Sequence, residues 1–164
     1  MVGWHNVGKT AFVERLIATL KARGVRVATI KHSRGDFDID RQGTDTRRYR
    51  QAGSDVVVIS APGRMAMIEE REDEASLEEL IGRLPQGIDL VITEGFKRVP
   101  TPKIEVTTRA AWEADGRITP EGLLLALVSD DEGVAVDGVP LFRRDDSAGV
   151  VALLERLGII ESVR

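Results

Sequence analysis

The sequence predicts an α/β fold in which a mostly parallel sheet is covered by helices. Three observations lead to this prediction. Short runs of β-branched residues, typical of strands, alternate with helical patterns along the whole chain. A glycine-rich turn at residues 3–10 leads at once into an amphipathic helix. No internal repeat or linker interrupts the alternation, so we expect one domain over residues 1–164.

The helices are predicted by apolar residues spaced three and four apart. In the helix expected over residues 9–23, this stripe consists of Phe12, Val13, Leu16, Ile17 and Leu20. Gly24 is expected to end that helix. Three further ranges have helical character: 43–52, 76–84 and 147–157.

Strands are predicted where β-branched and aliphatic residues form short runs. These runs are residues 25–30, 55–60, 64–69, 88–93, 103–107 and 123–129. Pro62 and Gly63 suit a tight reversal, so the second and third runs predict a β-hairpin added to the parallel sheet. Residues 33–42 are polar and acidic, and we expect a loop there.

Composition and charge exclude several classes of function. The net charge is −4, from 23 Lys and Arg against 27 Asp and Glu, which argues against a nucleic-acid binder. Cysteine is absent, which excludes disulfides, thiolate catalysis and Cys-ligated zinc, and His5 and His32 are too few for a histidine-rich metal tract. No apolar run approaches the length of a membrane span, and no signal peptide precedes the glycine-rich turn. We therefore expect a cytoplasmic protein without membrane contact.

Residues 3–10 read G-W-H-N-V-G-K-T, a complete G-x-x-x-x-G-K-T phosphate-loop motif. The two glycines let the backbone curl so that its N–H groups point at the β-phosphate. Lys9 reaches the β- and γ-phosphates, and the Thr10 hydroxyl ligates Mg²⁺. The motif and the helix after it predict a P-loop NTPase fold that binds a nucleoside triphosphate with Mg²⁺. The residues expected around the nucleotide are Gly3, Trp4, His5, Asn6, Val7, Gly8, Lys9, Thr10 and Ala11.

The start of the chain is unusual for this fold. A phosphate loop normally follows a buried strand, yet only Met1 and Val2 precede Gly3. The first strand is therefore predicted to be truncated or absent. Either the chain as given starts late, or the sheet lacks a central strand, which is costly because main-chain groups are left unpaired inside it. In the first case we expect a longer chain to form a strand beside residues 25–30.

Charged residues follow three predicted strands, at the edge where α/β proteins bind ligands. Lys31 and His32 end the first of them, where a solvated strand end is the alternative. Glu94 follows residues 88–93. A carboxylate at such a strand end beside a phosphate loop usually engages Mg²⁺ or its water shell, and the alternative is that Glu94 caps a helix or loop. Asp130 can accept two hydrogen bonds from guanine and so select GTP over ATP, with an ordinary turn aspartate as the alternative.

The acidic loop resembles a calcium loop only superficially. Asp36, Asp38 and Asp40 alternate as calcium ligands do, but Arg41 and Arg47 stand where an EF-hand needs glycine and glutamate. Calcium binding is therefore not expected. A place near the nucleotide's Mg²⁺ and a plain surface loop both remain open.

Four segments together resemble one known family. G-W-H-N-V-G-K-T, K-H-S-R-G-D-F-D-I-D-R-Q-G-T-D-T-R-R, T-E-G-F-K-R and P-K-I-E-V resemble, in order and spacing, the molybdopterin-guanine dinucleotide biosynthesis protein B family. The resemblance runs from Gly3 to Val106 and weakly through Asp130. It implies a homodimeric GTP-binding adapter with weak GTPase activity at most. Such an adapter assists the molybdenum cofactor guanylyltransferase, which joins GMP to molybdopterin; molybdopterin itself is a further candidate ligand.

The resemblance also assigns residues. It places the triphosphate on residues 3–10 and puts Glu94 in the second motif of the nucleotide site, beside the Mg²⁺ that Thr10 would hold. The chain departs from the family pattern at residues 33–35, where further histidines often occur, and at Ala11, where a second threonine is frequent. The resemblance assigns a signature loop made of Lys31, His32, Asp36, Asp38, Asp40, Asp45 and Arg47.

Two other functions remain open. Short phosphate-loop chains are often small-molecule kinases, which usually close an arginine-rich lid over the phosphates. The arginine cluster of Arg47, Arg48 and Arg50 is short and precedes a strand, so the kinase ranks second. A nickel-delivery GTPase ranks third, because the chain has no cysteine and two histidines.

Overall fold

A computed structural model describes residues 1–33, 35 and 37–161. Asp36, expected in the signature loop, lies outside these residues. The chain separates into two compact units, which are described one at a time. The larger unit consists of Met1–His32 and Leu77–Arg164, and the smaller unit consists of Ser33–Ser76.

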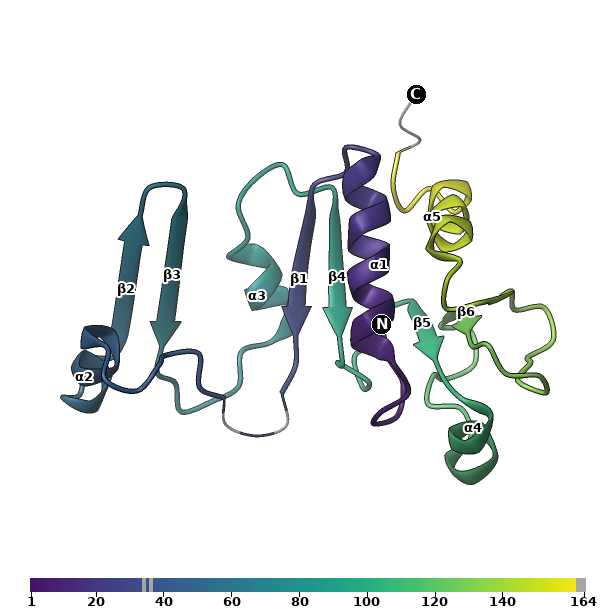
Figure 1. The fold of residues 1–164 in the computed structure, drawn as a ribbon, viewed down its shortest axis with the longest axis horizontal. Helices are drawn as coiled ribbons and strands as arrows, with labels where there is room; N and C mark the ends of the chain where they lie inside the picture. Colours follow the sequence, from purple (N-terminus) through teal and green to yellow (C-terminus); the bar gives the residue numbers. More distant parts are fainter. Residues whose placement is uncertain (34, 36, 162–164) are drawn as a thin grey trace. The chain divides into compact units, whose positions relative to one another are not determined.

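The strands of the larger unit are all parallel (Figure 1). β1 (Val27–Lys31) pairs with β4 (Leu90–Glu94). A second sheet contains β5 (Lys103–Val106), β6 (Leu124–Val128) and β7 (Leu141–Phe142) in that order. The predicted α/β architecture with parallel strands is confirmed.

Val2 attaches the start of the chain to the second sheet. It forms a parallel bridge with Glu105 of β5. Its N–H donates to the Ile104 carbonyl at 3.0 Å, and its own carbonyl accepts from the N–H of Val106 at 2.9 Å. Val2 is 1% exposed, so it occupies an interior position of a sheet.

Met1 attaches the same segment to β4. Its amine donates to the Thr93 carbonyl at 2.6 Å, and its carbonyl accepts from the N–H of Gly95 at 3.1 Å. Met1 and Val2 thus lie between β4 and β5, in the place of the expected first strand. The expectation that this strand would run beside residues 25–30 is wrong, because β4 lies between them and pairs with β1.

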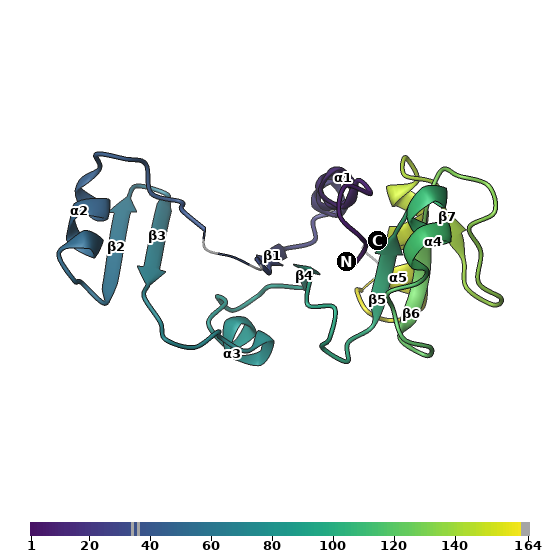
Figure 2. The same cartoon turned by 90° about the horizontal axis from the view of Figure 1, so that it is seen from below.

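Three helices pack on these strands. α1 (Lys9–Ala22) and α3 (Leu77–Gly82) lie on opposite sides of β1 and β4 (Figure 2). α5 (Ser147–Arg156) packs beside α1, where an ion pair joins Arg23 to Glu155 at 2.9 Å. No helix within the described residues is both long and apolar enough to cross a membrane.

The core of the larger unit is built on the predicted apolar stripe of α1. Phe12, Leu16 and Leu20 are each at most 1% exposed, and every such side chain contributes about 1.5 to 3 kcal/mol through burial. They share one hydrophobic cluster with α5 and with the strands. This cluster fixes the helix that begins at the phosphate loop.

The smaller unit contains the predicted hairpin. β2 (Val56–Ala61) pairs antiparallel with β3 (Arg64–Glu69), in register from Val56 opposite Glu69 to Ala61 opposite Arg64. Gly63 has φ 74° in the turn, a left-handed value that favours glycine. α2 (Asp45–Gln51) begins after Thr44, whose hydroxyl accepts from the N–H of Arg47.

Two elements of the larger unit were not predicted. α4 (Arg109–Asp115) has no buried residue and so no apolar stripe; it is started by Thr108, whose hydroxyl accepts from the N–H of Ala111 at 3.1 Å. β7 has only two residues. Neither element carries a periodic signal in the sequence.

Burial of the Met1 amine predicts how stability depends on pH. Removal from water, reinforced by the charge of Lys103 and opposed by that of Glu94, lowers the pKa of this amine from 8.0 to about 5. The unfolded chain binds the proton more tightly between these values, so the free energy of unfolding rises with pH across that window. Between these two pKa values the amine changes the free energy of unfolding by at most about 4 kcal/mol. The full stability is reached above pH 8.

The measurement is urea unfolding of the chain at pH values from about 5 to 8, with the N-terminally acetylated chain as control. Acetylation removes the titrating amine, so the free energy of unfolding of the acetylated chain should exceed that of the unmodified chain by more as the pH falls. Parallel pH profiles for the two chains would contradict this prediction.

Candidate functional site

The candidate site lies where the phosphate loop meets the carboxyl ends of β1 and β4. In the parallel register, Lys31 at the end of β1 stands opposite Glu94 at the end of β4. Because Met1 bonds to β4 and Val2 bonds to β5, Gly3 starts the loop at the same edge of the strands. The fold thereby brings together residues far apart in the sequence.

Glycine is required at both ends of the phosphate loop. A Cβ on Gly3 would lie 2.3 Å from the carbonyl oxygen of Val106, so no other residue fits without moving β5. Gly8 has φ 86° and directly precedes α1, and Asn6 has φ 59°. Val7 is buried at 2% exposure and holds the middle of the loop to the core, whereas His5 and Asn6 are exposed.

Lys9 folds back over the loop. Its Nζ donates to the carbonyl oxygen of Trp4 at 2.5 Å. Burial lowers the pKa of Lys9, Glu94 opposes this effect, and Lys31 adds to it. A partly desolvated ammonium held at the centre of a loop is a strong charge-assisted donor for an anion.

Thr10 and Glu94 face each other across the first turn of α1. The Thr10 hydroxyl donates to Glu94 Oε1 at 3.5 Å, and Lys31 Nζ lies 3.9 Å from the same oxygen. Hydroxyl and carboxylate oxygens are the ligand type that Mg²⁺ prefers. The sequence predicted both residues for this role, and the structure places them side by side.

His32 lies at the same edge but is held by neighbouring protein groups. Its main-chain N–H donates to the carbonyl of Glu94 at 2.9 Å. The centre of its ring lies 5.0 Å from the centre of the Phe96 ring. A Cβ on Gly95 would lie 3.0 Å from the Cβ of His32, so the backbone passes close to the histidine there. Within the described residues, no three His, Cys, Asp or Glu side chains form a metal cluster.

Trp4 forms one wall of the loop. Its indole N–H donates to the carbonyl of Gly116 at 3.0 Å, and Lys97 Nζ lies 4.5 Å from the centre of its ring. The cation–π contact brings another positive charge to the loop. Lys97 was not assigned to the site from the sequence, because nothing there indicates that it packs on Trp4.

Asp130 follows β6 and is 41% exposed at its side chain. Its Oδ1 accepts from the main-chain N–H of Arg144 at 3.0 Å, and both Arg143 and Arg144 bring guanidinium groups within 4 Å. The neighbouring Asp131 accepts instead from the N–H of Arg109 at 2.8 Å. The two aspartates therefore have separate roles, and only Asp130 shares its partners with the phosphate-loop side.

Arg144 is a site residue that the sequence analysis missed. Its Nη1 would lie 3.2 Å from a Cβ on Gly8, and its Nη2 donates to the carbonyl of Thr107 at 3.1 Å. Arg15 of α1 donates to the carbonyl of Arg144 at 2.9 Å and fixes the backbone there. The only sequence signal is the pair Arg143-Arg144 between two predicted elements, which does not indicate a contact with residue 8.

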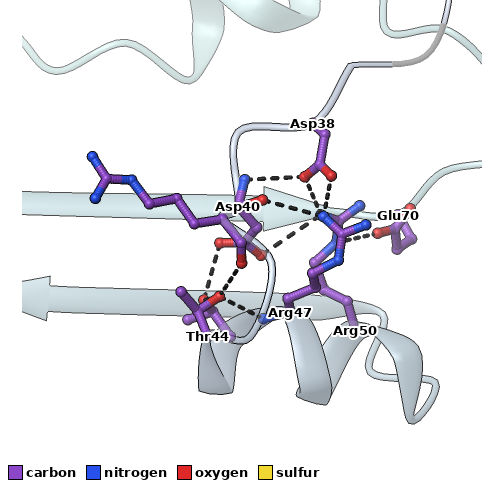
Figure 3. A network of polar contacts seen from close by, with 8 residues as sticks. Asp38, Asp40, Thr44, Arg47, Arg50 and Glu70 are labelled. Atoms are coloured by element: carbon purple, nitrogen blue, oxygen red, sulfur yellow. Dashed lines mark hydrogen bonds and ion pairs between the residues drawn. The ribbon is translucent and has the colours of Figure 1, made fainter.

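Asp38, Asp40 and Arg47 of the signature loop lie in the smaller unit and form an ion-pair network there (Figure 3). Arg47 binds the carboxylate of Asp38 and donates to the Asp40 carbonyl at 3.2 Å. Arg50 lies 3.6 Å from Asp40 and bonds to Glu70 at 2.6 Å. The Arg47 guanidinium lowers the pKa of Asp38 below its ordinary value.

The network explains why charged residues alternate in this loop. Thr46 donates to the carboxylate of Asp40 at 2.9 Å, so Asp40 is bonded from two sides. Asp45 lies in the first turn of α2, where a negative charge is favourable, and pairs with Arg48 at 3.5 Å. Asp38 and Asp40 therefore tie the loop to Arg47 and Arg50 of α2 within the smaller unit.

The fold and the loop define a protein of the P-loop NTPase class. Parallel strands, a G-x-x-x-x-G-K-T loop at the start of α1 and a carboxylate at the end of β4 are the features of that class. The chain belongs to the family of molybdopterin guanine dinucleotide synthesis protein B, whose family model matches residues 1–130.

Several relatives are similar to the chain. The probable molybdopterin-guanine dinucleotide biosynthesis adapter protein of Bacillus subtilis is 30% identical over 162 residues, 96% of this chain and 91% of the relative. The adapter protein of Escherichia coli is 32% identical over 130 residues, covering 77% and 74%. That of Haemophilus influenzae is 39% identical over 105 residues, and this match spans 63% of the chain and 59% of the relative.

Solved structures have the same fold. The crystal structure of Bacillus subtilis MobB matches with a TM-score of 0.74 and 28% identity, covering 98% of this chain and 96% of that chain. A crystal structure of molybdopterin-guanine biosynthesis protein B also has a TM-score of 0.74, at 30% identity, and covers 95% and 96%. The P-loop architecture predicted from the sequence is therefore confirmed.

Substitution of Lys9 tests the phosphate loop. We expect Lys9→Ala to reduce the affinity for GTP with Mg²⁺ by at least about a hundredfold, because charge-assisted bonds to two phosphates are lost. Titration calorimetry measures the affinity, and thermal melting checks that the fold is retained. The matched control is Lys21→Ala, at the far end of the same helix. Unchanged affinity in the Lys9 variant would exclude this loop as the phosphate site.

Proposed function

We propose that the chain is a GTP-binding accessory protein of molybdenum cofactor biosynthesis. It assists the guanylyltransferase that attaches GMP to molybdopterin, and it has weak GTPase activity at most. The observation that carries the proposal is the family match over residues 1–130, which includes the phosphate loop and Glu94. Relatives named as adapter proteins support the accessory role.

The structure has the groups that a Mg²⁺–nucleotide complex needs. Gly3 and Gly8 let the loop backbone pass close to the Val106 carbonyl and to Arg144, Lys9 supplies a positive charge, and Thr10 and Glu94 can supply oxygen ligands. Bound Mg²⁺ would neutralise phosphate charge and orient the γ-phosphate. Lys9 would exchange the Trp4 carbonyl for phosphate oxygens, and Thr10 would turn its hydroxyl oxygen from Glu94 to the ion.

The same geometry favours an adapter over the kinase that the sequence left open. The arginines at 47, 48 and 50 pair with acidic side chains of the smaller unit, where they stabilise the loop and hairpin. A kinase lid needs such arginines for the phosphates. The relatives with adapter names give the kinase no support.

Two assays test the proposed function. In the first, the cognate guanylyltransferase is captured on a resin and tested for retention of the chain with GTP and Mg²⁺. In the second, γ-labelled GTP is incubated with the chain, and phosphate released to water is separated from phosphate transferred to metabolites. The proposal expects retention, slow release to water and no transfer. Transfer to a metabolite without retention would establish a kinase instead.

Asp130 is proposed to read guanine. Its carboxylate can accept from the N1–H and the amino group of guanine, for which adenine has no matching pair of donors. We expect Asp130→Asn to weaken GTP binding by roughly thirtyfold to a thousandfold, from a loss of about 2 to 4 kcal/mol, with little effect on ATP. Competition binding with both nucleotides measures this selectivity.

Asp131→Asn is the matched control, because that side chain bonds to the start of α4 rather than to the Arg144 main chain. It should retain the preference for GTP. If Asp130→Asn and the unchanged chain prefer GTP equally, the guanine-reading group lies elsewhere.

The hairpin supports a homodimer. Val57 is the only buried apolar side chain among the described residues of the smaller unit, so this unit has almost no core of its own. Val58 and Met67 are paired across the hairpin and are 53% and 50% exposed, and Met65 on the same face is 69% exposed. An isolated two-stranded hairpin is marginally stable in water, so we propose that a second copy of the chain covers this face.

A charge on this face tests the proposed dimer. We expect Val58→Glu to weaken self-association by about a hundredfold, because the carboxylate would be buried without a partner. Sedimentation at several concentrations gives the dissociation constant. The control is Leu157→Glu, at an exposed apolar residue of the larger unit. It should leave the dissociation constant of the dimer unchanged. A monomeric unchanged chain would contradict the proposal outright.

A further inference from the structure

One arginine lies between the two parts of the candidate nucleotide site. Arg144 belongs to the connection between β7 and α5. Its Nη1 would lie 3.2 Å from a Cβ on Gly8, so the guanidinium is directly beside the phosphate loop. Its Nε lies 3.8 Å from Oδ2 of Asp130, the residue proposed to read guanine. One side chain therefore borders both the loop expected to hold phosphate and the group proposed to hold the base.

The protein uses little of this guanidinium's capacity to donate hydrogen bonds. A guanidinium has several N–H donors in one plane. Within the described residues, it donates to one acceptor, the carbonyl of Thr107, which Nη2 reaches at 3.1 Å. Nε is buried and donates no hydrogen bond, because 3.8 Å to Asp130 is too long for one. The side chain is 27% exposed, so a positive charge is partly removed from water with donors left over.

The main chain of Arg144 is fixed on both sides. Its N–H donates to Asp130 Oδ1 at 3.0 Å, and its carbonyl accepts from Nη1 of Arg15 in α1 at 2.9 Å. Two residues later, Asp146 starts α5 by accepting from the N–H of Gly149 at 2.8 Å. The base of the arginine side chain is thus held in place without a ligand, which reduces the entropy that binding would cost.

We propose that Arg144 binds the α-phosphate of the nucleotide. The main-chain N–H groups of a phosphate loop point at the β-phosphate, and Asp130 is proposed for the base. Between the β-phosphate and the base, a nucleotide has one anionic group, the α-phosphate. The planar fork of a guanidinium fits phosphate oxygens and forms charge-assisted bonds to them. This inference rests on the proposed function, because it requires that the chain bind a nucleotide.

Asp130 and Arg144 then have different effects on selectivity. The carboxylate of Asp130 distinguishes guanine from adenine, whereas Arg144 contacts a phosphate that GTP and ATP share. Loss of the Arg144 guanidinium should therefore weaken both nucleotides by the same factor and leave their ratio unchanged. An arginine that only oriented Asp130 would change that ratio instead.

The first test is Arg144→Ala, with Arg143→Ala as the matched control. Arg143 also lies within 4 Å of Asp130, but its side chain is 70% exposed and pairs with Asp145 as well. Competition against a fluorescent nucleotide gives the affinities for GTP and ATP, and thermal melting reports the fold. We expect Arg144→Ala to weaken both nucleotides by about tenfold to a hundredfold. The exposed ion pairs of Arg143 are weak, so its variant should change them by less than about threefold.

Sulfur substitution on the nucleotide separates direct contact from an indirect effect on the loop. In GTPαS, sulfur replaces one α-phosphate oxygen and is a weaker hydrogen-bond acceptor. We expect the unchanged chain to prefer one diastereomer of GTPαS by at least about fivefold, and Arg144→Ala to lose this preference. Arg143→Ala should retain it. GTPγS is the control nucleotide, and its affinity relative to GTP should be the same in all chains.

Arg144→Gln is measured alongside, because it keeps much of the side chain's packing without the charge. An unchanged diastereomer preference in both Arg144 variants would overturn the inference. So would unchanged affinity, or a loss confined to GTP, which would mean that the arginine acts through Asp130. In these cases the chain still binds GTP, and the proposed function stands. If the unchanged chain binds neither GTP nor ATP, the proposed function fails and this inference fails with it.

Discussion

The structure depends on the main-chain bonds that Met1 and Val2 make to two different strands. Met1 bonds to β4 and Val2 bonds to β5, so these two residues connect sheets that are otherwise separate. Gly3 follows at once, and its contact with the Val106 carbonyl leaves no room for a side chain. The position of the phosphate loop is thus set by the sheet, and the buried stripe of α1 holds its other end.

Charge at the site is organised around Glu94. This carboxylate lies beside Thr10, faces Lys31 across the strand register and opposes the effect of burial on the pKa of Lys9. A single negative group therefore lies near two lysines. Arrival of an anion with its cation would exchange these partners rather than create new unpaired charges, which makes the arrangement suitable for reversible binding.

The sequence alone predicted those elements whose signal lies within a short stretch of residues. The glycine and lysine spacing of the loop, the apolar stripe of α1 and the hairpin turn at Gly63 each predicted their element. Contacts between distant segments were not accessible in this way. The packing of Arg144 on Gly8 and the pairing of Met1 with β4 depend on strand order, and α4 and β7 lack periodic apolar residues. The alternating aspartates resembled ligands, whereas Asp38 and Asp40 pair with arginines.

We propose that Thr10 and Glu94 form the metal side of a phosphate-loop nucleotide site. The most direct measurement is a crystal structure with a non-hydrolysable GTP analogue and Mn²⁺, whose anomalous signal locates the ion. We expect one peak bound to the Thr10 hydroxyl and to the β- and γ-phosphates, near Glu94, with Lys9 moved from the Trp4 carbonyl to the phosphates. A peak remote from both side chains, or phosphates bound away from residues 3–10, would contradict it.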